Sequence, residues 1–255
     1  ELKSKYLLID VENLQNFINF LLYPIRLIFI LQYKIFRKPF STGYNFYKWK
    51  IIKETLNKKK ISYFSNTRGL DERVVEYYWL IDELKKYRGK LLDAGSTINF
   101  PIILKQLLKN FSITIQTLYP ENNNDLKNGV SYVYENLIEK NFHKNYFDVI
   151  TCISTLEHVG FDNEIYKTLQ INKKTRKNNQ VYLKVIKNFK YYLKKNGILL
   201  ITLPFGKYQK FNDLQQFDKK MINNIIKVFR PSKVEKKFAI YKNLQWQFCE
   251  EKDCL

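Results

Sequence analysis

Two adjacent residues near the middle of the chain, Glu157 and His158, carry side chains that could move a proton. They follow the apolar run from Phe147 to Ser154, so they come just after a predicted strand ends. An imidazole oriented by a carboxylate is a general base that can take a proton from an attacking hydroxyl. The alternative is a structural histidine that caps the following turn, and the sequence favours neither reading.

A second polar group follows an earlier apolar run, in which Lys90-Leu91-Leu92 leads into Asp93-Ala94-Gly95-Ser96. Glycine adopts backbone conformations that other residues avoid, so Gly95 would let the chain turn tightly and approach a ligand closely. Asp93 could orient the amides of this turn. The spacing therefore predicts a strand, a tight turn and a helix that starts near Pro101.

Short, β-branched and nearly unbroken apolar runs are typical of parallel strands that are buried on both faces. Such runs occur at 90–96, 113–118, 147–154 and 197–203. Between the last two, apolar residues at 182–193 recur with helical spacing, and Asn196-Gly197 is expected to stop this helix. Strands that alternate with helices predict a wound, mostly parallel α/β sheet, which binds ligands at the carboxyl ends of its strands.

Three motifs together resemble the class I, Rossmann-like methyltransferases that depend on S-adenosylmethionine. They are Leu-Leu-Asp-Ala-Gly-Ser at 91–96, Phe-Asp-Val-Ile-Thr-Cys-Ile-Ser-Thr-Leu-Glu-His-Val-Gly at 147–160, and Asn-Gly-Ile-Leu-Leu-Ile-Thr-Leu-Pro-Phe-Gly at 196–206. The resemblance covers roughly Asp71 to the C-terminus. It implies a seven-stranded type of sheet, and the segments 234–241 and 246–248 are expected to form its antiparallel edge.

The resemblance also implies a binding site for S-adenosylmethionine at the strand ends. The residues that it places there are Asp93, Gly95, Ser96, Thr97, Thr117, Glu121, Asn136, Leu137, Ser154 and Thr155. In this family Asp93 could also meet the ammonium of the methionine moiety. The helix before the first strand, which Asp71 is expected to cap, would either line that moiety, through Arg73, Glu76 and Tyr77, or simply cover the sheet.

The chain departs from the family pattern at two strand ends. The first turn has a single glycine, Gly95, and the acid that holds the ribose hydroxyls is replaced by Thr117. Either Glu121 takes over that role or the ribose is held less well. After the third strand, the family's acid corresponds either to Glu135 or to Asn136, whose amide could bind the adenine edge beside Leu137.

The implied activity is methyl transfer, which consists mainly of aligning a donor with an acceptor. Gln215-Gln216-Phe217-Asp218, followed by Trp246, is similar to methyltransferases of surface-polysaccharide and lipopolysaccharide biosynthesis. The expected acceptor is therefore a hydroxyl of a glycan or sugar precursor, with Lys207, Tyr208, Gln216 and Asp218 facing it. The alternative is a non-catalytic scaffold with a degenerate cofactor site.

The sequence divides into an apolar helical extension with a connector, residues 1–67, and a methyltransferase-like domain, residues 68–255. Within the extension, apolar residues at helical spacing predict two short helices that meet at Pro24. Residues 11–38 are expected to contact a membrane surface or a partner subunit, with Arg26, Lys34, Arg37 and Lys38 facing anionic headgroups. Packing on the chain's own body is the alternative.

The net charge of +20 would ordinarily indicate a polyanionic partner. The excess is mostly lysine, whereas nucleic-acid recognition favours arginine, so an RNA-directed role is the weakest hypothesis. The densest basic run, at 173–179, is most simply a solvated loop. Two histidines and three scattered cysteines predict no metal site and no disulfide framework. We expect a cytoplasmic protein, in contact with the inner membrane face if the extension binds lipid.

Overall fold

The computed structural model describes residues 11–36, 41–58, 61–161, 180–211 and 213–254. The basic run at 173–179, read from the sequence as a solvated loop, lies outside them. The chain forms two compact units. The first comprises Glu1–Val74 with Tyr241–Trp246, and the second comprises Val75–Ile240 with Gln247–Leu255.

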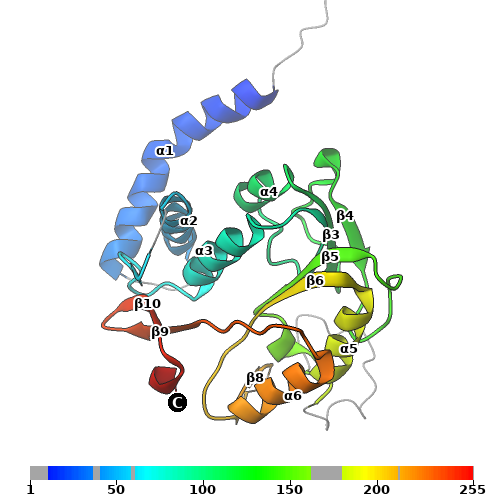
Figure 1. The fold of residues 1–255 in the computed structure, drawn as a ribbon. Helices are drawn as coiled ribbons and strands as arrows, with labels where there is room; N and C mark the ends of the chain where they lie inside the picture. The colour runs from blue at the N-terminus through cyan, green and yellow to red at the C-terminus, as the bar shows by residue number, and fades with distance from the viewer. Residues whose placement is uncertain (1–10, 37–40, 59–60, 162–179, 212, 255) are drawn as a thin grey trace, which may run out of the picture. The chain divides into compact units, whose positions relative to one another are not determined.

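A parallel sheet with the strand order β4-β3-β2-β5-β6 forms the centre of the second unit (Figure 1). Its strands are β2 (Gly89–Ala94), β3 (Phe111–Thr117), β4 (Ser131–Tyr134), β5 (Phe147–Ile153) and β6 (Leu193–Thr202). All four neighbouring pairs run parallel. The predicted wound α/β fold is confirmed, and the chain order reverses direction between β2 and β5, as in Rossmann-like sheets.

Helices precede, connect and follow these strands. They are α3 (Arg73–Leu84), α4 (Pro101–Leu107), α5 (Tyr182–Tyr192) and α6 (Lys219–Phe229), with the short 3₁₀ helices η1 (Leu126–Asn128), η2 (Leu156–His158) and η5 (Glu251–Cys254). Local chemistry sets two of the starts. Pro101 opens α4, where a missing N–H costs nothing, and the Asp218 carboxylate caps α6 by accepting a hydrogen bond from Met221 N at 2.8 Å.

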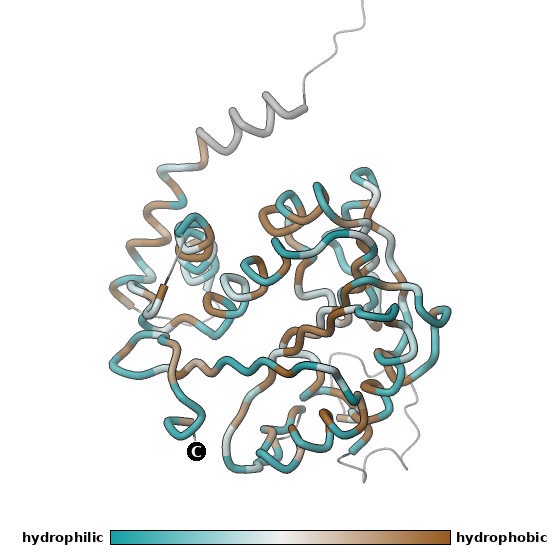
Figure 2. The backbone as a smooth tube through the Cα atoms, viewed as in Figure 1, coloured by the Kyte–Doolittle hydropathy of each residue, from teal (hydrophilic) through white to brown (hydrophobic). Residues whose placement is uncertain are grey.

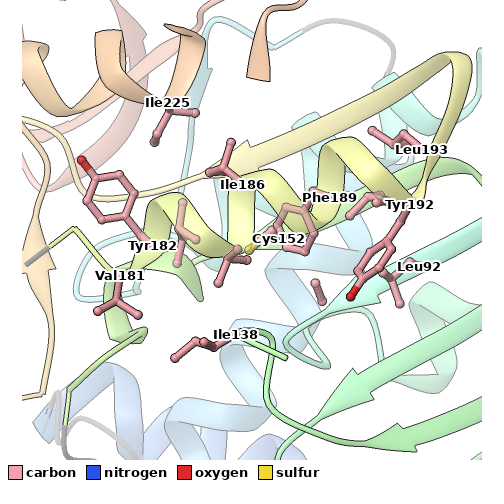
Figure 3. Packing of buried hydrophobic residues seen from close by; sticks show 14 of the residues in the cluster. Leu92, Ile138, Cys152, Val181, Tyr182, Ile186, Phe189, Tyr192, Leu193 and Ile225 are labelled. Carbon is pink, nitrogen blue, oxygen red and sulfur yellow. The ribbon is translucent and has the colours of Figure 1, made fainter. Parts of the chain in front are cut away.

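The amphipathic helix α5 supplies much of the core, as its spacing predicts. Tyr182, Val185, Ile186 and Phe189 are fully buried against residues of β2 and β5 such as Ile150 (Figure 3). Figure 2 shows the matching concentration of hydrophobic residues along the central strands. Each such aromatic or aliphatic side chain contributes roughly 2 kcal/mol by leaving water.

The end of α5 differs from the prediction that Asn196-Gly197 stops the helix. The helix ends at Tyr192, and β6 begins at once with Leu193, which is buried and pairs with Phe147. Asn196, with φ +66°, lies inside the strand at a register irregularity, because the pairing jumps from Phe147–Leu193 to Val149–Ile198. Asn and Gly therefore form a bulge here rather than a helix stop.

The first unit contains α1 (Val11–Phe36) and α2 (Thr42–Leu56), which pack together. The prediction of two helices meeting at Pro24 is wrong, because α1 continues through the proline and loses only one main-chain hydrogen bond there. Of the cations expected to face lipid, Arg26 lies over the Phe46 ring and Lys34 over the Tyr47 ring, both on α2. None of the described helices is long and apolar enough to cross a membrane.

A tyrosine cluster joins α1 and α2 to the segment that leads into α3. Tyr33 packs edge-on against Tyr44, and Tyr44 Oη donates a 2.7 Å hydrogen bond to Asp71 Oδ2, to which Lys48 Nζ also donates at 2.8 Å. The sequence suggested Asp71 as the cap of the next helix. Its carboxylate instead binds α2, and α3 begins at Arg73.

The strands β9 (Phe238–Lys242) and β10 (Gln245–Cys249) form the expected closing hairpin, but outside the parallel sheet. Asn243 and Leu244 both have positive φ, as a two-residue type I′ turn requires. The hairpin tip belongs to the first unit, where Trp246 donates hydrogen bonds to Thr67 Oγ1 and to the Leu70 carbonyl, both at 3.0 Å.

Candidate functional site

The loops that leave β2 and β5 meet at the point where the strand order reverses, which is where wound sheets bind ligands. Asp93 of β2 lies beside Thr151 of β5 in the parallel register. The backbone just beyond both strands is left-handed, with φ of +124° at Gly95, +62° at Ser96 and +40° at Ser154. Non-glycine residues in this region carry strain that the surrounding structure must hold, and such residues cluster at functional sites.

The buried carboxylate of Asp93 holds this turn in place. The side chain is fully buried, and its two oxygens accept hydrogen bonds from Ile98 N and Thr151 Oγ1, each at 2.9 Å. Of the two roles considered for Asp93, orienting the turn amides is the one that this geometry shows. Thr97 completes the turn by donating to the Ile153 carbonyl at 2.9 Å and accepting from Tyr77 Oη at 2.6 Å through its own carbonyl.

Position 95 must be a glycine because the Thr155 side chain packs against it. A Cβ at position 95 would overlap the side chain of Thr155, which also donates a 2.9 Å hydrogen bond to the Ile153 carbonyl. The two candidate residues are therefore brought together, and Thr155 occupies the space beside Gly95 that the sequence analysis reserved for a ligand.

The Glu121 carboxylate, which follows β3, contacts several polar side chains. Its Oε2 accepts hydrogen bonds from Ser96 Oγ at 2.8 Å and Asn99 Nδ2 at 3.0 Å, and Thr117 Oγ1 lies 3.5 Å from Oε1. The carboxylate is exposed, although its partners Ser96 and Asn99 are buried. Glu121 thus stands beside Thr117 at the end of β3.

Tyr132 of β4 ties this group to the next strand. Its hydroxyl donates to Asn99 Oδ1 at 2.9 Å and accepts from Asp125 N at 2.8 Å. Burial, followed by the charge of Asp125, raises the pKa of Tyr132 above its ordinary value, although the hydrogen bond from Asp125 N opposes this. The hydroxyl is therefore a neutral donor that holds Asn99 in place.

Asn136 and Leu137 form a turn just after β4. Asn136 Oδ1 accepts from Ile138 N at 2.9 Å, so the side chain caps its own turn. The buried amide of Asn188 on α5 supports the same turn, with Nδ2 3.0 Å from the Leu137, Ile138 and Glu139 carbonyl oxygens. The turn is therefore rigid, and it lies at the same edge of the sheet as Thr117, which accepts from Glu135 N through its carbonyl.

A residue of α3 covers the other side of the reversal point. Glu76 is buried, and its Oε1 accepts hydrogen bonds from Ser154 Oγ and Thr202 Oγ1, both at 2.5 Å. These two hydroxyls lie at the ends of β5 and β6. From the sequence, Glu76 was one of three residues on a helix that would either line the methionine moiety or simply cover the sheet. Its contacts with Ser154 and Thr202 could not be predicted, because nothing in one strand's sequence reveals a partner on α3.

Glu157 and His158 do not act as the expected pair. Glu157 is buried at 4% exposure and lies near Cys152, whose pKa is raised well above its ordinary value by burial, then by the charges of Glu157 and Asp93. His158 is partly exposed, and its Nδ1 lies 2.8 Å from the Asp213 main-chain oxygen. The group that orients the imidazole is thus a carbonyl and not a carboxylate.

This contact determines what His158 can do chemically. A carbonyl oxygen only accepts hydrogen bonds, so Nδ1 must carry a proton, and in the neutral ring Nε2 then carries the lone pair. The imidazole is held in the tautomer that a general base needs. Among the described residues, no cluster of His, Cys, Asp or Glu could hold a metal ion.

The residues expected to face an acceptor have varied roles. Asp218 caps α6, Gln216 Nε2 donates to the Lys207 carbonyl at 2.9 Å, and Tyr208 is exposed. Gln215, which the sequence did not single out as a site residue, is fully buried on β8 (Gln215–Gln216), and neither its Oε1 nor its Nε2 has a hydrogen-bond partner among the described residues. β8 pairs with β7 (Gln209–Lys210), in the segment that also supplies Asp213.

No protein-family model matches this chain, and no curated protein matches its sequence. Solved structures match part of it at low identity. The magnesium protoporphyrin IX methyltransferase of Synechocystis, crystallised with S-adenosylmethionine, is 12% identical, with 82% of this chain and 89% of that chain covered and a TM-score of 0.48.

Two other matches are of similar strength. The 1,6-didemethyltoxoflavin-N1-methyltransferase of Burkholderia thailandensis, crystallised with S-adenosylhomocysteine, is 12% identical, over 68% of this chain and 74% of that chain, with a TM-score of 0.48. A protein of Galdieria sulphuraria described as a sarcosine dimethylglycine methyltransferase is 16% identical over 65% of this chain, with a TM-score of 0.48. This chain covers 64% of that protein's length.

Proposed function

We propose that this chain is an S-adenosylmethionine-dependent methyltransferase that methylates a hydroxyl group, with a glycan or sugar precursor as the acceptor. The observation that carries the proposal is the position of Glu121. Its exposed carboxylate stands at the end of β3, one strand from the reversal point, and already accepts hydrogen bonds from neutral donors. A carboxylate at this place suits the two hydroxyls of a ribose.

The other residues at this edge fit a nucleoside in the same way. The Asn136–Leu137 turn would lie along the adenine, and the Gly95–Ser96 turn would lie beneath the ribose. When bound, the cofactor supplies a methyl group activated by a positively charged sulfur. In this half of the site, the chain would hold the nucleoside in a fixed position. The hydrogen bonds of Asp93 and Tyr132, which hold the surrounding turns, would serve this purpose.

The acceptor half is built around His158. A hydroxyl must lose its proton as its oxygen attacks the methyl carbon, and Nε2 of His158 would receive that proton. The Asp213 carbonyl keeps a proton on Nδ1, so in the neutral ring Nε2 carries the lone pair. Nitrogen acceptors that are already neutral need no such base, and for this reason we propose a hydroxyl acceptor.

A non-catalytic scaffold is the second candidate, and one observation favours it. The Thr155 side chain fills the space against Gly95, so the first turn does not present the open glycine surface that the family pattern uses. If this packing also persists when ligand is offered, the Glu121 group would be a structural cluster with no cofactor.

Radiolabelled methyl transfer tests the proposal. The purified chain is incubated with S-adenosylmethionine labelled in its methyl group and a panel of methyl glycosides, and label in the sugar fraction is measured. The proposal predicts transfer to at least one sugar and its loss in His158→Gln, with S-adenosylhomocysteine binding retained. Binding of S-adenosylhomocysteine without transfer to any hydroxyl would overturn the acceptor class, and absence of binding would favour the scaffold.

A further inference from the structure

The last residues of the second unit bring two cysteines together. Cys249 ends β10 and Cys254 ends η5, and their sulfur atoms lie 3.3 Å apart. Both side chains are partly exposed, whereas Cys152 is fully buried in β5. A disulfide requires a sulfur separation of about 2.05 Å, so a shift of little more than 1 Å would join the pair.

The turn between the two cysteines is closed and anchored. Glu250 N donates to Asp253 Oδ2, and Asp253 N donates to the Glu250 carbonyl, both at 3.0 Å. Lys219 Nζ of α6 lies 3.2 Å from Glu251 Oε1. These contacts hold the two sulfurs near each other without a covalent bond.

We propose that Cys249 and Cys254 are a modification site at which a small-molecule disulfide of the glutathione class forms a reversible intrachain disulfide. First, the Cys254 thiolate attacks one sulfur of the small disulfide, whose S–S bond breaks and releases one thiol. Cys249 then loses its proton to solvent and attacks the Cys254 sulfur, which releases the second thiol. Two protein thiols are oxidised by two electrons, and one small disulfide is reduced to two thiols.

The surroundings assign the order of these steps. Burial, then the hydrogen bond and the charge of Cys254, then Asp253 and Glu250 raise the pKa of Cys249 to about 12. This raised pKa favours the protonated thiol of Cys249, and the proposal therefore gives the first attack to Cys254. Closure of the ring depends on deprotonation of Cys249, so it should accelerate as the pH rises.

The site lies next to the segment that follows β6. The Cys254 carbonyl oxygen would lie 3.3 Å from a Cβ placed on Gly206, and Glu251 is paired with the first residue of α6. A disulfide would thus fix the C-terminal turn beside the Phe205–Lys207 turn, on the side of the sheet proposed to receive the acceptor. The modification itself does not depend on the proposed function.

Thiol counting by mass spectrometry tests the proposal. The folded chain is equilibrated with mixtures of reduced and oxidised glutathione, quenched with acid, denatured and alkylated. We expect three alkylated cysteines under reducing conditions and one, Cys152, under oxidising conditions, with an intact mass lower by two hydrogens before alkylation. The Cys249→Ser variant should stop as a mixed disulfide that carries one glutathione on Cys254.

Three results would overturn the proposal. They are three alkylated cysteines at every glutathione ratio, a lasting mixed disulfide on the unmodified chain, and a disulfide-linked dimer on a non-reducing gel. The Cys152→Ala variant is the matched control, because it should leave the oxidation of the other two cysteines unchanged.

Discussion

The two halves of the candidate site are built differently. On the β2–β3–β4 side, Asp93, Glu121 and Asn136 each have hydrogen-bond partners within the unit, and each supports a turn. On the side that follows β5 and β6, the Asp213 carbonyl orients His158, and the Gln215 amide is buried with no hydrogen-bond partner in the part of the chain that the structure describes. In the first half, side chains of the protein already hold the turns without a ligand. The second half contains buried polar atoms, those of Gln215, that have no hydrogen-bond partner among the described residues.

The largest effect is expected from removing the central support of the organised half. In Asp93→Ala, the buried Ile98 N loses its acceptor and Thr151 Oγ1 keeps only the Leu92 carbonyl at 3.3 Å, at roughly 1–3 kcal/mol for each donor. We expect the free energy of unfolding to fall by about 3 kcal/mol, measured by urea denaturation. Thr151→Val, which removes one donor together with its bond, should cost about 1 kcal/mol.

Equal losses in these two variants would show that the Asp93 carboxylate does not hold the turn. In that case the organised half would owe its order to the left-handed backbone at Gly95 and Ser96 alone.

The opposite sign is expected in the other half. Gln215→Met replaces an amide, whose two polar atoms are buried and have no partner among the described residues, by an apolar side chain of similar length. We expect the free energy of unfolding to rise by about 1 kcal/mol. Its neighbour Gln216 donates to the Lys207 carbonyl, so Gln216→Met should lower stability slightly, measured in the same denaturation series.

A loss of stability in Gln215→Met would contradict the difference between the two halves, because it would mean that the amide already has an effective partner. Such a result would remove Gln215 from consideration as a residue that contacts an acceptor.

The smallest effect should come from Asp148, which lies at the start of β5 and so at the opposite end of the strands from the candidate site. Partial burial raises the pKa of Asp148, but hydrogen bonds from Lys194 and from Lys90 N, with the charge of Lys194, outweigh it and leave the pKa below its ordinary value. The carboxylate therefore stabilises the fold above about pH 4, and this contribution is lost as the pH falls through the lowered pKa.

Asp148→Asn should flatten this acid limb, as measured by urea midpoints between about pH 3 and pH 6. The loss at neutral pH should be under about 1 kcal/mol, since Lys194 is exposed and water screens the pair. S-adenosylhomocysteine affinity should not change, and a change would show that the two ends of the strands are coupled.

The architecture could be predicted well from the sequence because short local patterns indicate its strands and helices. The apolar runs that became β2, β3, β5 and β6 and the helical spacing of α5 are each visible within a dozen residues. The errors arose where long-range packing decides the outcome. Pro24 is accommodated inside α1, which packs against α2, and Asn196-Gly197 lies in a strand because Leu193 pairs with Phe147.

The site was predictable only in part for the same reason. Strand ends can be read from the sequence, so Asp93, Gly95, Thr117, Glu121 and Ser154 could be placed at one edge. The contacts that define their roles cross between distant elements, as Glu76 does with Thr202 and His158 does with Asp213. No spacing rule connects such pairs, and the partner of His158 is a main-chain carbonyl that any residue could supply.

Calorimetric titration with S-adenosylhomocysteine tests the central claim most directly. The unmodified chain should bind, and Glu121→Gln should bind about 30-fold more weakly, because hydrogen bonds to a charged group are worth about 2 kcal/mol. Glu139→Gln, with the same change of charge on an exposed residue after β4, should bind as the unmodified chain does. No heat of binding to the unmodified chain, or equal affinity in all three proteins, would contradict the account.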